Sequence, residues 1–212
     1  MQKKYRWGLR LLTIGYCIYM IFFAKIYQFM ALNVFLAYIP IEISFHLKKV
    51  NSKFFVILSV LWLLFYPNAP YLFTDFFHLE LLPIYQGMDY IFGLSLSGWL
   101  SFSLLAIGIC AWGLIGMNTF FTVFSEFRKR QLIKKKWHQA VLFLAVNLLS
   151  SLAIFVGRFD RLHSVHLFTQ PINTLKIIFF DWSIEKLGFI LILTGFQLVL
   201  LMAINGIKTD SC

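Results

Sequence analysis

The sequence predicts an all-α membrane protein, a polytopic bundle of about six transmembrane helices that forms a single domain over residues 1–212. Composition supports this fold class, because 60% of the residues are hydrophobic, 13% are charged, and the mean hydropathy is +0.78. A soluble domain carries about 25% charged residues, which places this chain in the membrane class. The lengths of the apolar runs and the positions of the charges give the same answer.

Six apolar segments are candidates for the roughly 20-residue helix that crosses the hydrocarbon layer. They cover residues 7–24, 29–47, 53–66, 90–115, 139–156 and 187–206. The first resembles a signal peptide, but no small-x-small cleavage site follows it, so we expect it to be retained. The third is short because Pro67 follows it. The fourth lies within a longer apolar run, 90–124, and is expected to tilt or to extend beyond the membrane.

The distribution of charge predicts the orientation of these spans. With a cytoplasmic N-terminus, 14 of the 19 Lys and Arg residues fall on the inner side, and six of the nine acidic residues fall outside. The positive-inside rule therefore favours six spans of a plasma membrane with both termini in the cytoplasm. The outer bases are few: Lys25, Arg158, Arg161, Lys176 and Lys186.

The net charge of +10 does not indicate nucleic-acid binding, because the bases cluster at the ends of apolar runs. The basic segment 128–138 is interpreted as a topology signal that also contacts anionic membrane lipids. The three cysteines show neither a CxxC pair nor a Cys/His zinc spacing. No GxSxG, P-loop, HExxH or GxGxxG motif is present, so the sequence identifies no cofactor and leaves enzymatic activity open.

The segment 66–78 carries an unusual density of polar residues at the end of the third span. Pro67 and Pro70 lack backbone donors and predict a break in the helix there. We expect Asn68 or Ala69 to cap a new helix that begins near Tyr71. Thr74, Asp75 and His78 would then share one face of it. The free N–H groups of such a half-helix are a natural site for an anion.

A second polar segment, 157–166, follows the fifth span on the same predicted side. Arg158 and Arg161 are three residues apart and are suited to clamp a phosphate or carboxylate. Arg158 lies close to the end of a span, where an unpaired charge is costly, so we expect Asp75 or Asp89 to be its partner. The alternative interpretation is an ordinary structural ion pair that joins two outer loops.

Histidines offer a weaker prediction. His163 and His166 are also three residues apart, and with Asp75 and His78 they have the ligand types of a zinc site. Isolated histidines in loops are more often solvated, so we assign no metal site. Within the second span, Glu42 lies near the cytoplasmic end, where we expect it to reach water or to pair with Lys48 or Lys49.

Residues 64–75 with His78 and Leu79 resemble the signature of an uncharacterised bacterial membrane-protein family, domain of unknown function 1361. Residues 157–159, followed by Arg161 and Pro171, are similar to a second part of that signature. The resemblance implies a shared feature at the positions of Asn68, Asp75, His78, Arg158 and Arg161, but no activity. Residues 162–166 depart from the family's Trp-Asn-Ser-Trp-Asp run and keep only the Ser.

The leading functional hypothesis is an extracytoplasmic pocket that binds an anionic group, such as a lipid or lipid-linked phosphate. Asp75 would orient an arginine and His78 would exchange a proton, while the expected binding residues are Asn68, Tyr71, Thr74, Asp89, Arg158 and Arg161. Two alternatives stay open. One is a membrane-embedded hydrolase or transferase, with or without a metal, and the other is a structural partner of other membrane proteins or of a second copy of the chain.

Overall fold

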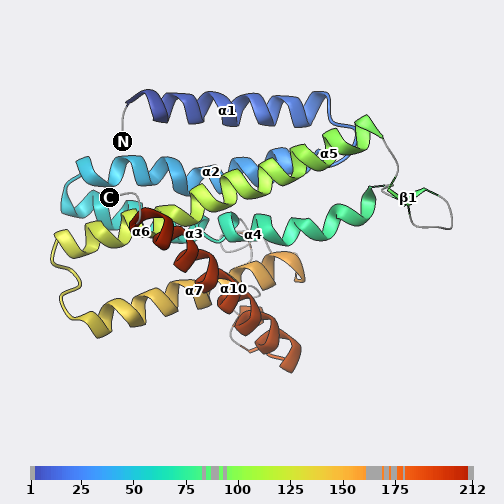
Figure 1. The fold of residues 1–212 in the computed structure, drawn as a ribbon. Helices are drawn as coiled ribbons and strands as arrows, with labels where there is room; N and C mark the ends of the chain where they lie inside the picture. The colour runs from blue at the N-terminus through green and yellow to red at the C-terminus, as the bar shows by residue number, and fades with distance from the viewer. Residues whose placement is uncertain are drawn as a thin grey trace.

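The computed structural model describes residues 3–82, 85–86, 91–92, 95–160, 169, 172, 176–178 and 180–209, and helices make up most of them (Figure 1). The helices of the first half are α1 (Lys3–Phe22), α2 (Met30–His46), the 3-10 turn η1 (Leu47–Lys49), α3 (Ser52–Phe65), α4 (Asn68–Thr74) and the 3-10 segment η2 (Asp75–Leu81). A short antiparallel pair follows, β1 (Tyr85–Gln86) and β2 (Ile91–Phe92). The second half contains α5 (Leu96–Ile107), the π-helical η3 (Gly108–Trp112), α6 (Gly113–Lys129), α7 (Lys136–Arg158) and α10 (Ile184–Thr209).

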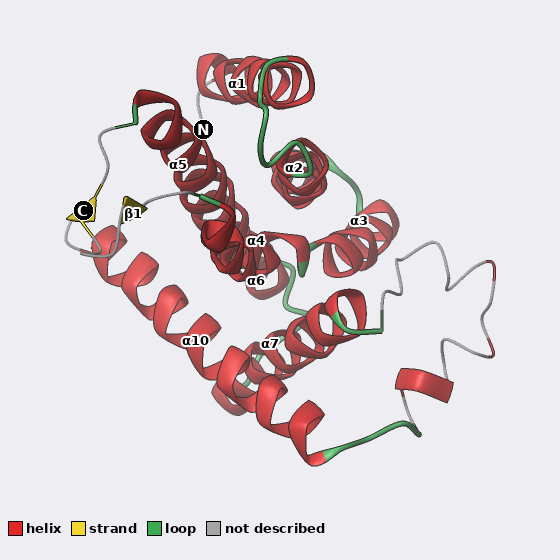
Figure 2. Cartoon of the chain, turned by 90° about the vertical axis from the view of Figure 1, so that its right-hand side faces the viewer, coloured by secondary structure: helices red, strands yellow, loops and turns green. Residues whose placement is uncertain are grey.

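Five helical segments in this described part are long and apolar enough to cross a membrane: Met30–Lys49, Ser52–Leu81, Leu96–Lys129, Lys136–Arg158 and Ile184–Ile207. The sixth expected segment, α1, is a 20-residue helix that packs along α2. Figure 2 shows α1, α2 and α3 nearly end-on around α4 and α6, with α7 and α10 on the other side. The predicted all-α membrane bundle is therefore confirmed.

One boundary differs from the prediction. The fourth span begins at Leu96 rather than near residue 90, because the strand β2 occupies part of that apolar run. Near the prolines, α3 ends at Phe65 and α4 begins at Asn68, and together with η2 they form a 30-residue helical segment. Apolar composition alone did not locate the start of the fourth span, because a hydrophobic strand and a hydrophobic helix look alike over so few residues.

A charged cluster within the bundle fastens α1 to α2. The Arg10 guanidinium donates through Nε to Glu42 Oε2 at 3.1 Å, and its Nη2 pairs with Glu42 Oε1. Tyr38 donates its hydroxyl to the same carboxylate at 2.6 Å, and His46 Nε2 lies 3.0 Å from it. Glu42 therefore pairs with Arg10 of the neighbouring helix and not with Lys48 or Lys49, the partners that the sequence offered. Arg10, Tyr38 and His46 together satisfy a carboxylate that would be costly if left alone in a membrane.

The junction between α5 and α6 is a second place where hydrogen bonds join α1 to the rest of the bundle. The π-helical turn η3 widens the helix at this junction, where Tyr16 donates its hydroxyl to Leu104 O at 2.9 Å. Trp112 Nε1 donates to Thr13 Oγ1 at 2.8 Å. Buried polar groups at such a position need partners. These two bonds thus fix the depth of α1 against the long helix of the second half.

Glycines on α6 allow α4 to approach closely. A Cβ atom at Gly116 would lie 2.5 Å from Ala69 Cβ, and one at Gly113 would lie 2.7 Å from Phe73 Cε2. Small residues at helix contacts are the usual way that membrane helices come close together. The α6 glycines therefore hold α4, which carries the polar segment, in the centre of the bundle.

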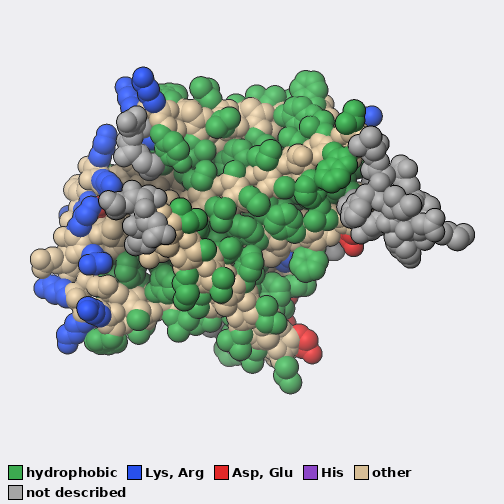
Figure 3. Space-filling view, viewed as in Figure 1, with side chains coloured by type: hydrophobic (Ala, Val, Ile, Leu, Met, Phe, Trp, Pro, Cys, Tyr) green, Lys and Arg blue, Asp and Glu red, His purple; other side chains and the backbone are tan. Residues whose placement is uncertain are grey.

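The two ends of the bundle differ in charge. Figure 3 shows Lys and Arg side chains gathered at the end where α1 begins and α6 ends, with Asp and Glu toward the opposite end. At the basic end, Arg130 Nη2 donates to Leu47 O and Val50 O and so ties α6 to the connection between α2 and α3. From α4, the segment η2 runs toward the opposite end, and α7 also ends on that side (Figure 1).

Candidate functional site

Local hydrogen bonds hold the connection between α3 and α4. Asn68 Nδ2 donates to Phe65 O at 2.9 Å, so its side chain closes the end of α3 instead of capping a later helix. The Ala69 amide donates to Tyr66 O and the Tyr71 amide to Pro67 O. The new helix begins at Asn68, not near Tyr71, and these amides are occupied. The structure therefore gives no support to an anion site at the start of a half-helix.

Arg158, the last residue of α7, reaches across to α4. Its Nη1 atom lies 3.1 Å from Asp75 Oδ1, 3.1 Å from Thr74 Oγ1 and 3.4 Å from the Tyr71 hydroxyl. The guanidinium also lies over the Tyr71 ring, 5.6 Å from its centroid. The expected pairing of Arg158 with Asp75 is thus present, and Tyr71 and Thr74 are part of the same cluster.

Asp75 is the buried centre of this cluster, with a relative exposure of 1%. Its second oxygen, Oδ2, accepts a 2.7 Å hydrogen bond from Asn33 Nδ2 on α2. Each carboxylate oxygen therefore has a strong donor, one from α7 and one from α2. Such a buried charge persists only when partners satisfy it.

His78 lies at the rim of the cluster. Its Nε2 atom is 3.9 Å from Asp75 Oδ1, and about a third of its side chain is exposed. The Phe29 ring packs 4.7 Å from the imidazole, centroid to centroid. Tyr27 donates its hydroxyl to His78 O at 2.9 Å, and burial raises the pKa of that phenol.

The backbone of Tyr27 is unusual, with φ of +68°. A non-glycine residue rarely adopts this left-handed conformation, which costs on the order of 1 kcal/mol or more. In this strained conformation the Tyr27 hydroxyl reaches the carbonyl oxygen of His78. It therefore helps to position the 3-10 segment η2 against the connection between α1 and α2.

Several predicted residues cannot be placed. Asp89, Arg161, His163 and His166 lie outside the described residues. Within the part of the chain that the structure does describe, no three His, Cys, Asp or Glu side chains gather as a metal site. Of the weak metal candidates, His78 alone is described, and it contacts Asp75.

Sequence reasoning missed Asn33 and Tyr27. Asn33 is the polar residue in an otherwise apolar stretch of the second span, and a polar side chain at such a depth predicts an internal partner. That signal was available, although it does not say which helix provides the partner. Tyr27 gives no comparable signal, since tyrosine is common near membrane interfaces.

The cluster joins a buried carboxylate to two basic side chains near one end of the bundle. Among the described residues, the hydrogen bonds of Arg158 all leave Nη1, so Nε and Nη2 have no partner there. These two donors form the fork that suits a planar or tetrahedral oxyanion.

Comparison with known proteins agrees with the sequence signature. The family model described as protein of unknown function (DUF1361) matches residues 32–200, a range that begins in the second span and ends in the last one. No curated protein and no solved structure matches the chain. Because the match covers most of the sequence, and the Asp75–Arg158 cluster lies within it, the chain belongs to the DUF1361 family of proteins of unknown function.

Proposed function

We propose that this multi-pass membrane protein binds an anionic group, the phosphate of a lipid or lipid-linked molecule, at the cluster of Arg158, Asp75 and His78. The binding face would be the outer side of a plasma membrane, with both chain termini in the cytoplasm. The contrast in charge between the two ends of the bundle supports this orientation, because cytoplasmic ends carry an excess of Lys and Arg.

The observation that carries the proposal is the arrangement of the Arg158 donors. Nη1 is engaged by Asp75, Thr74 and Tyr71, which fixes the plane of the guanidinium. Nε and Nη2 are without partners among the described residues, and the side chain is 19% exposed. A guanidinium held in place with its fork available costs little ordering when it binds phosphate.

His78 extends the site. Its imidazole lies beside the same Asp75 oxygen and is more exposed than the arginine. His78 would supply a second donor to the bound group.

Arg158→Lys is the sharpest test, because lysine keeps the charge beside Asp75 and loses the forked donors. The probe is dodecyl phosphate, compared with neutral dodecanol, and the readout is thermal stabilisation of the detergent-purified protein. We expect the phosphate to stabilise the wild type more than the alcohol does. The variant should bind about tenfold more weakly, which corresponds to losing one charged hydrogen bond of about 1.5 kcal/mol.

Arg128→Lys, the same change at an exposed position on the opposite end, is the matched control and should bind as the wild type does. Equal responses of wild type and Arg158→Lys to dodecyl phosphate would reject the binding role. The cluster would then be an internal ion pair that joins α7 to α4, as in a purely structural partner of other membrane proteins.

A further inference from the structure

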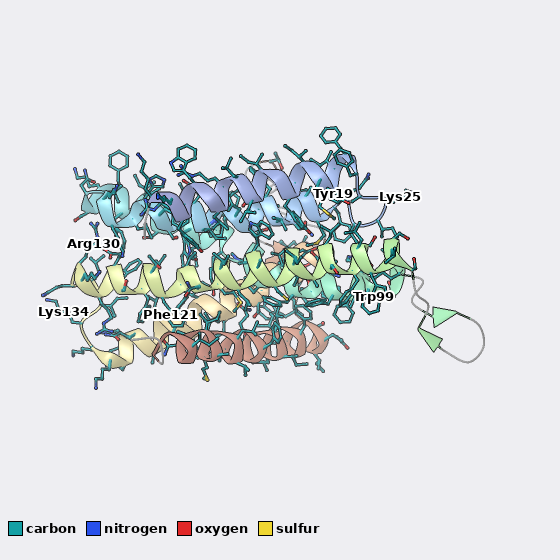
Figure 4. The ribbon with its side chains drawn as sticks, turned by 45° about the horizontal axis from the view of Figure 1, so that its top comes forward. Tyr19, Lys25, Trp99, Phe121, Arg130 and Lys134 are labelled. Atoms are coloured by element: carbon teal, nitrogen blue, oxygen red, sulfur yellow. The ribbon has the colours of Figure 1, made fainter. Side chains whose placement is uncertain are left out.

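A separate groove lies between the end of α1 and the beginning of α5. It has a volume of about 220 Å³, and the residues that line it include Tyr19, Met20, Phe23, Lys25, Ser97 and Ser101. Figure 4 shows Tyr19 on α1, Lys25 on the connection that follows α1, and Trp99 on α5, all at the same end of the bundle. None of the residues in the Arg158 cluster lines it.

Lys25 gives this groove a positive charge. No acidic side chain among the described residues forms an ion pair with it, and the residue is exposed. Two other bases at this end are engaged: Arg158 pairs with Asp75, and Lys186 Nζ donates to Ile177 O and Asp181 O. Lys25 is thus a cation that lines a cavity and lacks a counter-charge in the described structure.

Hydroxyl groups face the same cavity. Ser95 and Ser97 both line the groove, and their Oγ atoms are 3.1 Å apart, so one of the two hydroxyls donates to the other. The Gly98 amide already donates to Ser95 Oγ. One hydroxyl hydrogen of the pair therefore has no acceptor among the described residues. A further polar contact is available beside the lysine.

The rest of the groove is apolar and open to the side of the bundle. Its walls include Phe23 and Leu100, whose side chains are 68% and 51% exposed. Trp99 is half exposed beside them, as aromatic residues are at the level of lipid headgroups. A charged and hydroxylated end joined to apolar walls has the polarity of a phospholipid, with its phosphate at one end and its acyl chain along the other.

We propose that this groove binds an anionic phospholipid of the surrounding bilayer, with its phosphate at Lys25 and the serine pair and an acyl chain between α1 and α5. The lipid would join α1 to the second half of the chain. The α1 side of the groove, from Tyr19 to Ile26, lies before residue 32, where the family match begins.

The test is native mass spectrometry of protein released from nanodiscs that contain phosphatidylglycerol or phosphatidylcholine. Lys25→Met should lower the occupancy of one retained phosphatidylglycerol about fivefold, which corresponds to about 1 kcal/mol for one interfacial lysine. Lys25→Arg should retain the lipid. Lys176→Met removes an exposed lysine that does not line the groove, so it should leave occupancy unchanged.

A photoreactive acyl chain gives an independent measurement of position. It should crosslink to peptides that contain residues 19–26 or 96–104 in the wild type, and less in Lys25→Met. Equal loss of lipid in the Lys25 and Lys176 variants, equal retention of the two phospholipids, or crosslinks elsewhere would overturn the proposal. Arg158→Lys should keep this lipid, so failure here is distinguishable from failure at the Arg158 cluster.

Discussion

Arg158 Nη1 and Asp75 Oδ1 lie 3.1 Å apart, although 83 positions separate the two residues in the chain. The pair joins the end of α7 to the start of η2, and Asn33 on α2 satisfies the other carboxylate oxygen. Three helices therefore meet at one buried charge. This relationship determines both the stability of that end of the bundle and the direction in which the remaining arginine donors point.

Breaking this ion pair should be more damaging than removing both charges. Arg158→Met leaves Asp75 buried without its main counter-charge, which costs about 3–5 kcal/mol in the free energy of unfolding. The double variant Arg158→Met with Asp75→Asn should recover part of that loss. Thermal unfolding of the four proteins in detergent measures the coupling. Additive losses in the double variant would show that the two side chains do not interact.

Asn33 should prove to be a positioning residue for Asp75. Asn33→Leu leaves Asp75 Oδ2 without its 2.7 Å donor, so we expect a loss of about 1.5–3 kcal/mol in stability. It should also weaken dodecyl phosphate binding by disturbing the arginine. Gln28→Leu is the control, because Gln28 is exposed and donates only to Ala24 O within the described structure. Comparable effects of the two substitutions would contradict the role of Asn33.

The approach of α4 to α6 should depend on Gly116. Gly116→Ala places a methyl group 2.5 Å from Ala69 Cβ, and separating the helices should cost about 1–3 kcal/mol. Gly195→Ala on α10 has open space around the new atom and should instead stabilise the helix by about 0.5–1 kcal/mol. Melting temperatures of the two variants should therefore move in opposite directions. A neutral Gly116→Ala would show that this contact is looser than the structure describes.

Two adjacent serines on α7 should respond differently to the same substitution. Ser151 Oγ lies 2.9 Å from Thr194 Oγ1 and accepts a 2.7 Å bond from Gln197 Nε2, which joins α7 to α10. Ser151→Ala should cost about 1 kcal/mol, as hydrogen bonds between membrane helices typically do. Ser150 Oγ is buried without a partner in the described structure, so Ser150→Ala should be neutral or stabilising. A larger loss for Ser150→Ala would reveal a partner for its hydroxyl.

The proposed orientation can be tested by cysteine labelling in intact cells. The three native cysteines are first replaced, and single cysteines are placed at exposed Glu80 or Arg128. An impermeant maleimide should label position 80 from outside, and position 128 only after the membrane is permeabilised. The opposite pattern would move the Arg158 cluster to the cytoplasm and end the proposal of an extracytoplasmic site.

Much of the fold could be predicted because a membrane constrains the sequence strongly. Apolar length located the spans, and the cost of an unpaired charge indicated that Arg158 needed an acidic partner. The start of the fourth span was less secure, because β2 shares the apolar composition of the helix that follows it. The role of Asn68 was also misjudged, because an asparagine side chain can either cap a following helix or donate to the end of the preceding one.

The sequence by itself determined that the chain is a helical membrane bundle, which end carries the bases, and that segments 66–78 and 157–166 hold its polar groups. Only the tertiary structure decided that Asn33 donates a hydrogen bond to the second carboxylate oxygen of Asp75, that Arg10 rather than a nearby lysine pairs with Glu42, and that Lys25 lines a groove. The reason is physical. Hydrophobicity and charge place each helix across the membrane, whereas the relative rotation and depth of neighbouring helices arise from side-chain packing between segments far apart in the chain.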